Sequence, residues 1–403
     1  MSASMSRLAL PTFLLSCLLA FLAGHMVNYS IIFIALEKFE SHSLAGIGYG
    51  LCFGPPLILG WLAGVYCDRY SPRRVILLAQ NSYFISLILI YLLLQFTAEW
   101  QPALLLLAAF FSGVAWSFVA PARFATLPFY VSPTKLAGAT IALNLMVMTG
   151  FGLAPMLLKQ VKVTWGWDGV LVTAVALLML STLLLLPLRF QFNAKAADKA
   201  FIEIKNSLAF VRDTVLVKQL LLLAAIAYLL MGPMQVLLPT IAEQNLQLDE
   251  TAQGNYLSLV AFSLILGGLL AMVLKNTGKL GLQMMFTILI AAAGIVYLGM
   301  ESNLYRSVAV LIISSMCGGI AISYLVAGLQ HYSPDEHRGR IMSFYTIVGQ
   351  VIPAASGVGA GLLAQVFDIP TALKICSGFI VLSLVCCLIF LKPIRRLETY
   401  QHG

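Results

Sequence analysis

Charged residues are scarce in this chain of 403 residues. Asp, Glu, Lys and Arg together make up 10% of it, whereas hydrophobic residues make up 60%. A typical soluble domain carries about 25% charged residues. This shortage of charge excludes an ordinary soluble protein and indicates a membrane protein that crosses the bilayer many times.

Patterns of catalytic and metal-binding residues are also missing. The seven cysteines lie in or beside apolar runs without metal-ligand spacing, so we expect neither a metal site nor a disulfide framework. The chain has no HExxH sequence and no recognisable nucleophile with a partner histidine. We therefore expect a protein that is not an enzyme and needs no cofactor, although a membrane-embedded enzyme is an alternative class.

Charge is absent from the middle of the long apolar runs as well. No Asp, Glu, Lys or Arg lies near the centre of any of them, where a charge is costly and usually functional. Proton coupling through a buried carboxylate is therefore unsupported. His25, near Asn28 and Tyr29, is the candidate for proton coupling, because imidazole titrates near physiological pH. A neutral histidine that is hydrogen-bonded between helices is the alternative.

Twelve apolar runs are long enough to cross the hydrocarbon layer as helices. They lie near residues 8–36, 44–66, 74–96, 103–121, 138–159, 167–188, 218–242, 252–274, 281–300, 306–328, 341–366 and 371–391. The first run is too long for the core of a signal peptide and lacks a convincing cleavage site, so we expect it to be retained.

Basic residues support this count of spans. With the N-terminus inside, most of the 24 Lys and Arg residues fall in cytoplasmic connections, including Arg123 after the fourth span. Only Lys38, Lys159, Lys162, Arg306 and Lys374 fall on the opposite side. The pattern predicts a multi-pass protein of the cytoplasmic (inner) membrane with both termini in the cytoplasm. It also explains the net charge of +8 without a nucleic-acid partner.

A hydrophilic stretch after the sixth span divides the chain. We predict an N-terminal six-helix bundle over residues 1–190, a cytoplasmic linker over 191–217 and a C-terminal six-helix bundle over 218–403. In the linker, apolar residues at helical spacing predict an amphipathic interfacial helix; they are Phe201, Ile204, Leu208 and Val211. Gly60, Leu62, Ala63 and Val65 correspond to Gly268, Leu270, Ala271 and Val273, which suggests an internal repeat. The predicted fold is all-α with two pseudo-symmetric halves, and transporters built in this way bind solute near the midplane.

The short turn between the second and third spans carries a dense charge pattern. Its spacing is Gly64-x-x-x-Asp68-Arg69-x-x-x-Arg73-Arg74. An ordinary positive-inside turn would explain the arginines but not the acid before them. The pattern resembles the loop between helices 2 and 3 of the major facilitator superfamily. That resemblance implies a cytoplasmic gate made by the aspartate and arginines.

A second charged turn, QHYSPDEHRGR over residues 330–340, leads into the eleventh span. The N-terminal end of that helix offers unpaired N–H groups and a partial positive charge, which suit capping by Asp68. Arg338 and Arg340 are expected to pair with nearby acids or lipid phosphates. An ordinary loop is the alternative reading. The gate candidates are Asp68, Arg69, Arg73, Arg74, Arg338 and Arg340.

Three segments resemble one branch of the superfamily, which holds drug exporters and enterobactin-type siderophore exporters. They are SPDEHRGR in the second charged turn, PARFATLPFYVSP at 121–133 and PTIAEQNLQLDETAQG at 239–254. The resemblance implies export of a small amphipathic compound by alternating access, with proton antiport as one coupling mode. The fifth span keeps Gly150 and Pro155 of the antiporter pattern but replaces its other glycines, which weakens the case for antiport.

Other functions remain open. Lysophospholipid transporters of the same superfamily have a similar loop after the fourth span, so a lipid-like substrate is the alternative. Downhill facilitation and a sensor that binds without transporting are further alternatives. The expected partners are the amphipathic solute, membrane lipids and protons, and we expect a monomer.

The resemblance also implies a cavity lined by the first, fourth, seventh and tenth spans and flanked by the second, fifth, eighth and eleventh. Polar, aromatic and sulfur-containing residues at suitable depth are the cavity candidates. They are His25, Asn28, Tyr29, Ser112, Trp116, Asn144, Met148, Tyr228, Gln235, Ser314, Ser315, Tyr345 and Gln350. Several of these share a helix face, because they are spaced by three, four or seven residues. An uncharged pocket of this kind suits a bulky amphipathic or aromatic solute.

Overall fold

The structure is a computed structural model that describes residues 8–96, 99–188, 209–274, 279–395 and 397. Helices dominate, and no strand occurs within these ranges. Eleven helical segments are long and apolar enough to cross a membrane. The predicted all-α membrane fold is therefore confirmed. Of the predicted linker helix, Phe201, Ile204 and Leu208 lie outside the described residues, and only Val211 is seen, in a helical stretch at 209–213.

Eleven segments accommodate twelve predicted spans because one segment contains two of them. Helix α6 (Pro133–Leu185) covers the fifth and sixth predicted spans and bends at Gly166. Gly166 has φ 66° and ψ −167°, a backbone conformation that residues other than glycine rarely adopt. The second span is likewise interrupted, between α2 (His42–Phe53) and α3 (Pro56–Arg69), at the Gly54–Pro55 pair.

The chain forms two compact units. Unit 1 comprises residues 1–40, 51–197 and 250–258, and unit 2 comprises 41–50, 198–249 and 259–403. Helices α2 and α10 (Glu250–Leu274) each run from one unit into the other. The helices of unit 1 alone are α1 (Ala9–Glu37), α3, α4 (Pro72–Gln95), α5 (Gln101–Thr126), the 3-10 turn η1 (Leu127–Phe129) and α6.

Unit 2 alone contains α8 (Val215–Tyr228), α9 (Met231–Thr240), the π-helical turn η2 (Ile241–Asn245), α11 (Leu280–Leu298), α12 (Leu304–His331), α13 (Asp335–Val366), α14 (Ile369–Phe390) and α15 (Lys392–Arg395). Helices α8 and α9 belong to one predicted span. Pro233 cannot donate a backbone hydrogen bond to the carbonyl of Leu229, and the helix is interrupted there.

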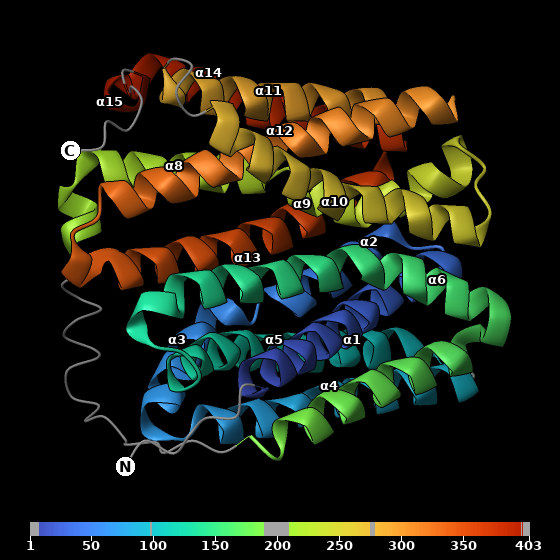
Figure 1. Cartoon of the computed structure of the whole chain (residues 1–403). Helices are drawn as coiled ribbons and strands as arrows, with labels where there is room; N and C mark the ends of the chain where they lie inside the picture. The colour runs from blue at the N-terminus through green and yellow to red at the C-terminus, as the bar shows by residue number, and fades with distance from the viewer. Residues whose placement is uncertain (1–7, 97–98, 189–208, 275–278, 396, 398–403) are drawn as a thin grey trace, which may run out of the picture. The chain divides into compact units, whose positions relative to one another are not determined.

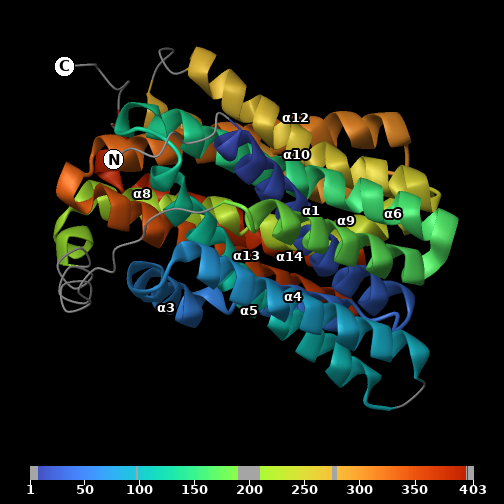
Figure 2. The same ribbon diagram turned by 60° about the horizontal axis from the view of Figure 1, so that its bottom comes forward.

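Helix α1 is the centre of unit 1. It is apolar on nearly all sides and is buried continuously from Ala20 to Ala35. It packs along α6, while α4 packs along α5 (Figures 1 and 2). A helix that is hydrophobic all round is stable only inside a bundle, so α1 is a core helix and its few polar residues are buried with it. In unit 2, α11 packs along α12, and α13 packs on α8 and α9.

The first residues of α2 cross α13 within unit 2 through glycines. A Cβ at Gly361 would lie 2.4 Å from the His42 carbonyl oxygen, and one at Gly46 would lie 2.7 Å from the Gly357 carbonyl oxygen. Glycines four residues apart on both helices allow this backbone contact, as in other close helix crossings in membranes. His42 Nε2 and Thr240 Oγ1, 3.2 Å apart, add a hydrogen bond beside it.

The crossing generates a stability prediction. Gly361→Ala should lower the free energy of unfolding by about 2 kcal/mol, because the new methyl group must displace backbone atoms. Gly378→Ala on α14 is the matched control, since a Cβ there meets nothing within 4 Å. Thermal unfolding of the purified protein in one detergent should separate the two variants. Equal melting temperatures would contradict the close crossing.

Candidate functional site

Four predicted cavity residues meet between α1 and α5 in unit 1. We call His25, Asn28, Ser112 and Trp116 the α1–α5 cluster. All four are buried, and Ser112 Oγ donates a hydrogen bond of 2.6 Å to Asn28 Oδ1. The ring centroids of His25 and Trp116 lie 5.1 Å apart. The sequence therefore identified residues that the fold brings into one cluster.

Aromatic rings surround the cluster. Phe151 of α6 lies edge-on to His25 with centroids 5.3 Å apart, and Tyr29 stacks on Phe151 at 6.2 Å. Phe53 of α2 and Phe21 of α1 each lie edge-on to Trp116 at 5.9 Å. Tyr29 was a predicted cavity residue, whereas the three phenylalanines were not. The arrangement offers π surfaces on several sides of a small polar centre.

Three polar atoms of the cluster have no hydrogen-bond partner. They are His25 Nε2, Asn28 Nδ2 and Trp116 Nε1. Their residues are only 5%, 3% and 6% exposed. A buried polar atom without a partner costs about 1–3 kcal/mol, so three in one place are unusual for a region that serves packing alone. The cluster has hydrogen-bonding capacity that the described protein groups leave unused.

No acidic side chain among the described residues contacts His25. Its ring neighbours are aromatic, and they do not compensate the cost of burying a positive charge. These surroundings favour the neutral imidazole. The role of His25 in proton coupling remains a prediction.

Arg123 differs from its sequence-based placement. We expected it in a cytoplasmic connection, but it lies in the last turn of α5 and is wholly buried. Its Nη1 donates to Ser16 Oγ and Cys17 Sγ, each at 3.2 Å, and its Nη2 donates to Ser181 Oγ at 3.0 Å. We call Arg123 and these three partners the arginine network. It joins α1, α5 and the second half of α6 without a carboxylate.

A second group of charges, of which only Lys159 is buried, is balanced. Glu37 of α1, Lys159 and Lys162 of α6, and Glu250 of α10 form an ion cluster inside unit 1. Glu37 lies 2.6 Å from both ammonium groups, and Glu250 lies 2.9 Å from Lys162 and 3.6 Å from Lys159. The Lys159 side chain is only 3% exposed and lies over the Phe33 ring. Two acids and two bases therefore neutralise each other at this site.

Unit 2 brings two other predicted residues together. Tyr228 of α8 donates a 2.8 Å hydrogen bond to Tyr345 of α13, and their ring centroids are 5.7 Å apart. Gly349 of α13 admits the Tyr228 ring, since a Cβ there would lie 2.9 Å from it. The two tyrosine hydroxyls bond to each other, whereas the N–H donors of Asn28 and Trp116 in unit 1 are unused.

The other predicted cavity residues of unit 2 are more dispersed. Ser314 and Ser315 of α12 line a cavity of only about 40 Å³, which is far below the 300 Å³ or more of a typical ligand pocket. Gln235 of α9 is buried and Gln350 of α13 is half-buried. Within the described part of the chain, neither of them forms a hydrogen bond with the tyrosine pair.

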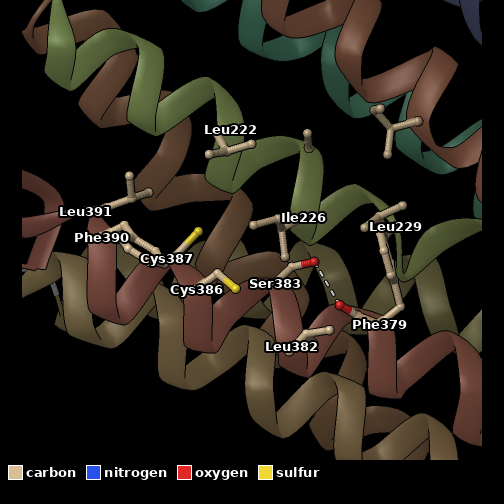
Figure 3. A pocket seen from close by; sticks show the side chains of 12 residues that line it. Leu222, Ile226, Leu229, Phe379, Leu382, Ser383, Cys386, Cys387, Phe390 and Leu391 are labelled. Atoms are coloured by element: carbon tan, nitrogen blue, oxygen red, sulfur yellow. Dashed lines mark hydrogen bonds between the residues drawn. The ribbon is translucent and has the colours of Figure 1, made fainter.

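Unit 2 also contains an apolar groove of about 580 Å³ between α8, α13 and α14 (Figure 3). Leu222, Ile226, Phe379 and Leu382 line it with other apolar side chains. Ser383 is its one hydroxyl, and that group donates to the Phe379 carbonyl oxygen at 2.8 Å. The groove suits hydrocarbon, and no predicted cavity residue lines it.

The remaining cavity candidates lie on the exposed side of α6. Asn144 is exposed and donates to the Thr140 carbonyl oxygen of its own helix at 3.1 Å, and Met148 is 38% exposed. Neither contacts the α1–α5 cluster through an interaction seen in the described part of the chain.

The gate candidates are only partly described. The side chain of Asp68 lies outside the described residues, so its contact with the start of α13 remains a prediction. Arg69 and Arg74 are exposed, and Arg73 donates to the Leu186 carbonyl oxygen at the end of α6. Arg338 donates to the carbonyl oxygens of Gln330 and Ser333, at 3.0 and 3.2 Å, and so closes the end of α12. Arg340 is half-buried and has partners of its own.

Comparison with known proteins decides the family. The family model described as "Transmembrane secretion effector" matches residues 53–401, which is most of the chain. The chain belongs to this transmembrane secretion effector family. It is therefore a multi-pass transporter of the major facilitator type, as the resemblance of its charged turns implied.

One curated relative of this chain is the enterobactin exporter EntS of Shigella boydii serotype 4 (strain Sb227). The two are 26% identical over 370 residues, which cover 88% of this chain and 84% of that protein. Among solved structures, a bacterial homologue of the iron transporter ferroportin in an inward-facing state is 17% identical with TM-score 0.72, covering 97% of this chain and 100% of that chain. The nucleoside transporter NupG is 15% identical with TM-score 0.73, covering 96% and 99%. At such identities the structures show the fold alone.

Sequence reasoning missed several residues at these sites. Arg123 lies seven residues after Trp116 and eleven after Ser112, so helical spacing alone places all three on one face of α5. That signal was available. The ion cluster gave no comparable signal, because Glu37, Lys162 and Glu250 come from three distant parts of the sequence.

The arginine network predicts a clear difference between two cations. Arg123→Lys should lower the free energy of unfolding by about 2 kcal/mol, because one ammonium group cannot reproduce the forked contacts to Ser16 and Ser181. Arg306→Lys on the exposed start of α12 is the control and should change stability little. Chemical denaturation of both purified variants measures this. A fully stable Arg123→Lys protein would show that the network does not hold the three helices together.

Proposed function

We propose that the protein is a secondary transporter that exports a small amphipathic organic compound, of the drug or siderophore class, across the cytoplasmic membrane by alternating access. The single observation that carries the proposal is the α1–α5 cluster, a buried polar centre with unused hydrogen-bonding atoms and aromatic walls. It lies on the first and fourth spans, where the family resemblance implies a solute cavity. A relative named as an enterobactin exporter supports the siderophore class.

In this proposal the chain works as a monomer in the inner membrane with both termini in the cytoplasm. The asymmetry of basic residues supports that orientation. Proton antiport is the proposed coupling mode, and His25 is the candidate proton carrier. Its aromatic surroundings favour the neutral imidazole in the described state, so proton uptake would accompany a change in those surroundings.

A lipid-like substrate is the second candidate. The apolar groove beside α14 favours it, because about 580 Å³ of hydrocarbon-lined space suits an acyl chain (Figure 3). The one hydroxyl among its lining residues, that of Ser383, is already used, and the thiols of Cys386 and Cys387 are only weak donors.

Alternating access requires contacts that break and re-form during each cycle. We propose that the ion cluster is one such contact. Glu250 is the first residue of α10, which continues into unit 2 after Ser258. Lys162 and Lys159 hold this residue to α6, and Gly254 lies against the Pro155 carbonyl oxygen one turn later, where a Cβ would be only 2.8 Å away. The cluster lies on the predicted outer side, and we assign it the role of an outer latch. The predicted inner gate of Asp68, Arg69, Arg73, Arg74, Arg338 and Arg340 would then close the opposite side.

Flux measurements test the proposed function. Everted membrane vesicles that contain the protein should accumulate at least one compound from a panel of siderophores and amphipathic dyes in preference to lysolipids, and collapse of the proton gradient should reduce that accumulation. Vesicles without the protein are the control. Preferential accumulation of lysolipids would support the second candidate, and saturable binding without any flux would indicate a sensor.

The outer latch predicts rescue by charge exchange. Lys162→Glu places three acids around Lys159, so transport should fall about tenfold because the latch no longer closes. The double variant Lys162→Glu/Glu250→Lys restores two acids and two bases and should recover at least half of the wild-type rate. Lys38→Glu, on an exposed neighbouring residue, is the control for a change in net charge. Initial rates in everted vesicles measure the effect, and a double variant as slow as the single one would rule out the latch.

A further inference from the structure

We infer that the α1–α5 cluster binds a flat aromatic solute through its oxygen atoms and that it selects neutral or anionic solutes over cations. Asn28 and Trp116 supply the N–H donors. This inference deepens the proposed function, since it assigns a substrate class to the same site.

The first argument is the chemistry of the unused atoms. Trp116 Nε1 carries a hydrogen and has no lone pair to accept with, and Asn28 Nδ2 is also only a donor. The oxygen of the Asn28 amide is already used by Ser112. The free capacity of these two residues therefore consists of N–H donors, which require acceptors such as carbonyl, phenolate or carboxylate oxygen.

The second argument is the charge around the cluster. The guanidinium of Arg123 lies 5.8 Å from the Phe21 ring centroid, and Phe21 in turn contacts Trp116. The two lysines of the ion cluster are neutralised by Glu37 and Glu250. Arg123 has only hydroxyl, thiol and aromatic neighbours among the described side chains. The inner end of the α1–α5 contact therefore carries a positive charge that lacks a carboxylate partner, and this favours an anionic solute.

The third argument is shape. His25, Trp116, Phe53 and Phe151 present ring faces and edges within centroid distances of 5.1 to 6.5 Å. At these distances the rings contact one another, and a flat aromatic solute that enters between them would make ring contacts of the same kind, which add binding energy that does not depend on a particular polar pattern. The N–H donors of Asn28 and Trp116 then fix the position of the solute's oxygen atoms.

Two dyes with the same ring system test the inference directly. Fluorescein and tetramethylrosamine share a xanthene core, but at neutral pH the first is anionic and the second cationic. The purified full chain should bind fluorescein at least about tenfold more tightly, measured by fluorescence anisotropy. Asn28→Asp removes a donor and adds an acid of the same shape, so it should reverse this preference. Trp116→Phe keeps a ring but removes the N–H, and should weaken fluorescein binding about five- to tenfold.

Trp165→Phe is the matched control, because that tryptophan is 68% exposed beside the bend of α6. It should leave both affinities unchanged. The ratio of the two dye affinities is the decisive reading, since a variant that is merely damaged loses both dyes together. An unchanged ratio in Asn28→Asp, a wild-type preference for the cation, or no binding of either dye would each overturn the inference.

Transport of the same dyes separates this inference from the proposed function. If everted vesicles accumulate the cationic dye in preference, export stands and the assigned substrate class is wrong. If the purified chain binds the dyes with the expected ratio and its variants behave as described, but vesicles accumulate neither dye, the site assignment stands and export does not.

Discussion

The structure depends on one constraint: in a bilayer, a buried polar group has no water to bind, so it needs a partner within the protein. Only 10% of this chain is charged, and its polar groups inside the helices are few. Their arrangement is therefore informative. The ion cluster satisfies its members with opposite charges, and the arginine network satisfies most of its donors with hydroxyls and a thiol. The α1–α5 cluster leaves three atoms without partners.

The ion cluster, the arginine network and the α1–α5 cluster differ in the structural changes that they permit. A balanced ion cluster is strong while it is closed, but its members can be hydrated separately when water enters, which suits a contact that opens and closes. A guanidinium held by Ser16 and Ser181 has no such alternative partner among the described groups, and it connects helices of a single unit. The arginine network is therefore suited to holding α1, α5 and α6 together.

The sequence predicted the spans well because their cause is local. Length and apolar composition locate each span. The breaks at Pro55 and Pro233, inside predicted spans, were not predicted, because a proline such as Pro155 can also lie inside a continuous helix. The clustering of His25, Asn28, Ser112 and Trp116 also followed from helical spacing and the family resemblance. Which of their atoms bond to each other did not follow, since that depends on how α1 and α5 face one another.

Arg123 shows what the positive-inside rule leaves unaddressed. Its position at the end of an apolar run suggested a cytoplasmic connection, and the positive-inside rule counts a residue there without asking where its side chain points. In the fold, Ser16 and Ser181 come from helices that are distant in sequence, and their hydroxyls accept hydrogen bonds from the guanidinium. These bonds offset part of the cost of burying it. The ion cluster escaped prediction for the same reason, because Glu37, Lys162 and Glu250 are neighbours only after folding.

The two units also differ in how they use their polar side chains, and this bears on recognition. Tyr228 and Tyr345 bond to each other in unit 2, so their hydroxyls are already satisfied. In unit 1, Asn28 and Trp116 keep their donors unused beside a positively charged network. A solute gains more from groups that lack partners than from groups that must first exchange one, because no existing hydrogen bond is lost. In our proposal, the polar part of solute recognition therefore belongs to the α1–α5 cluster of unit 1.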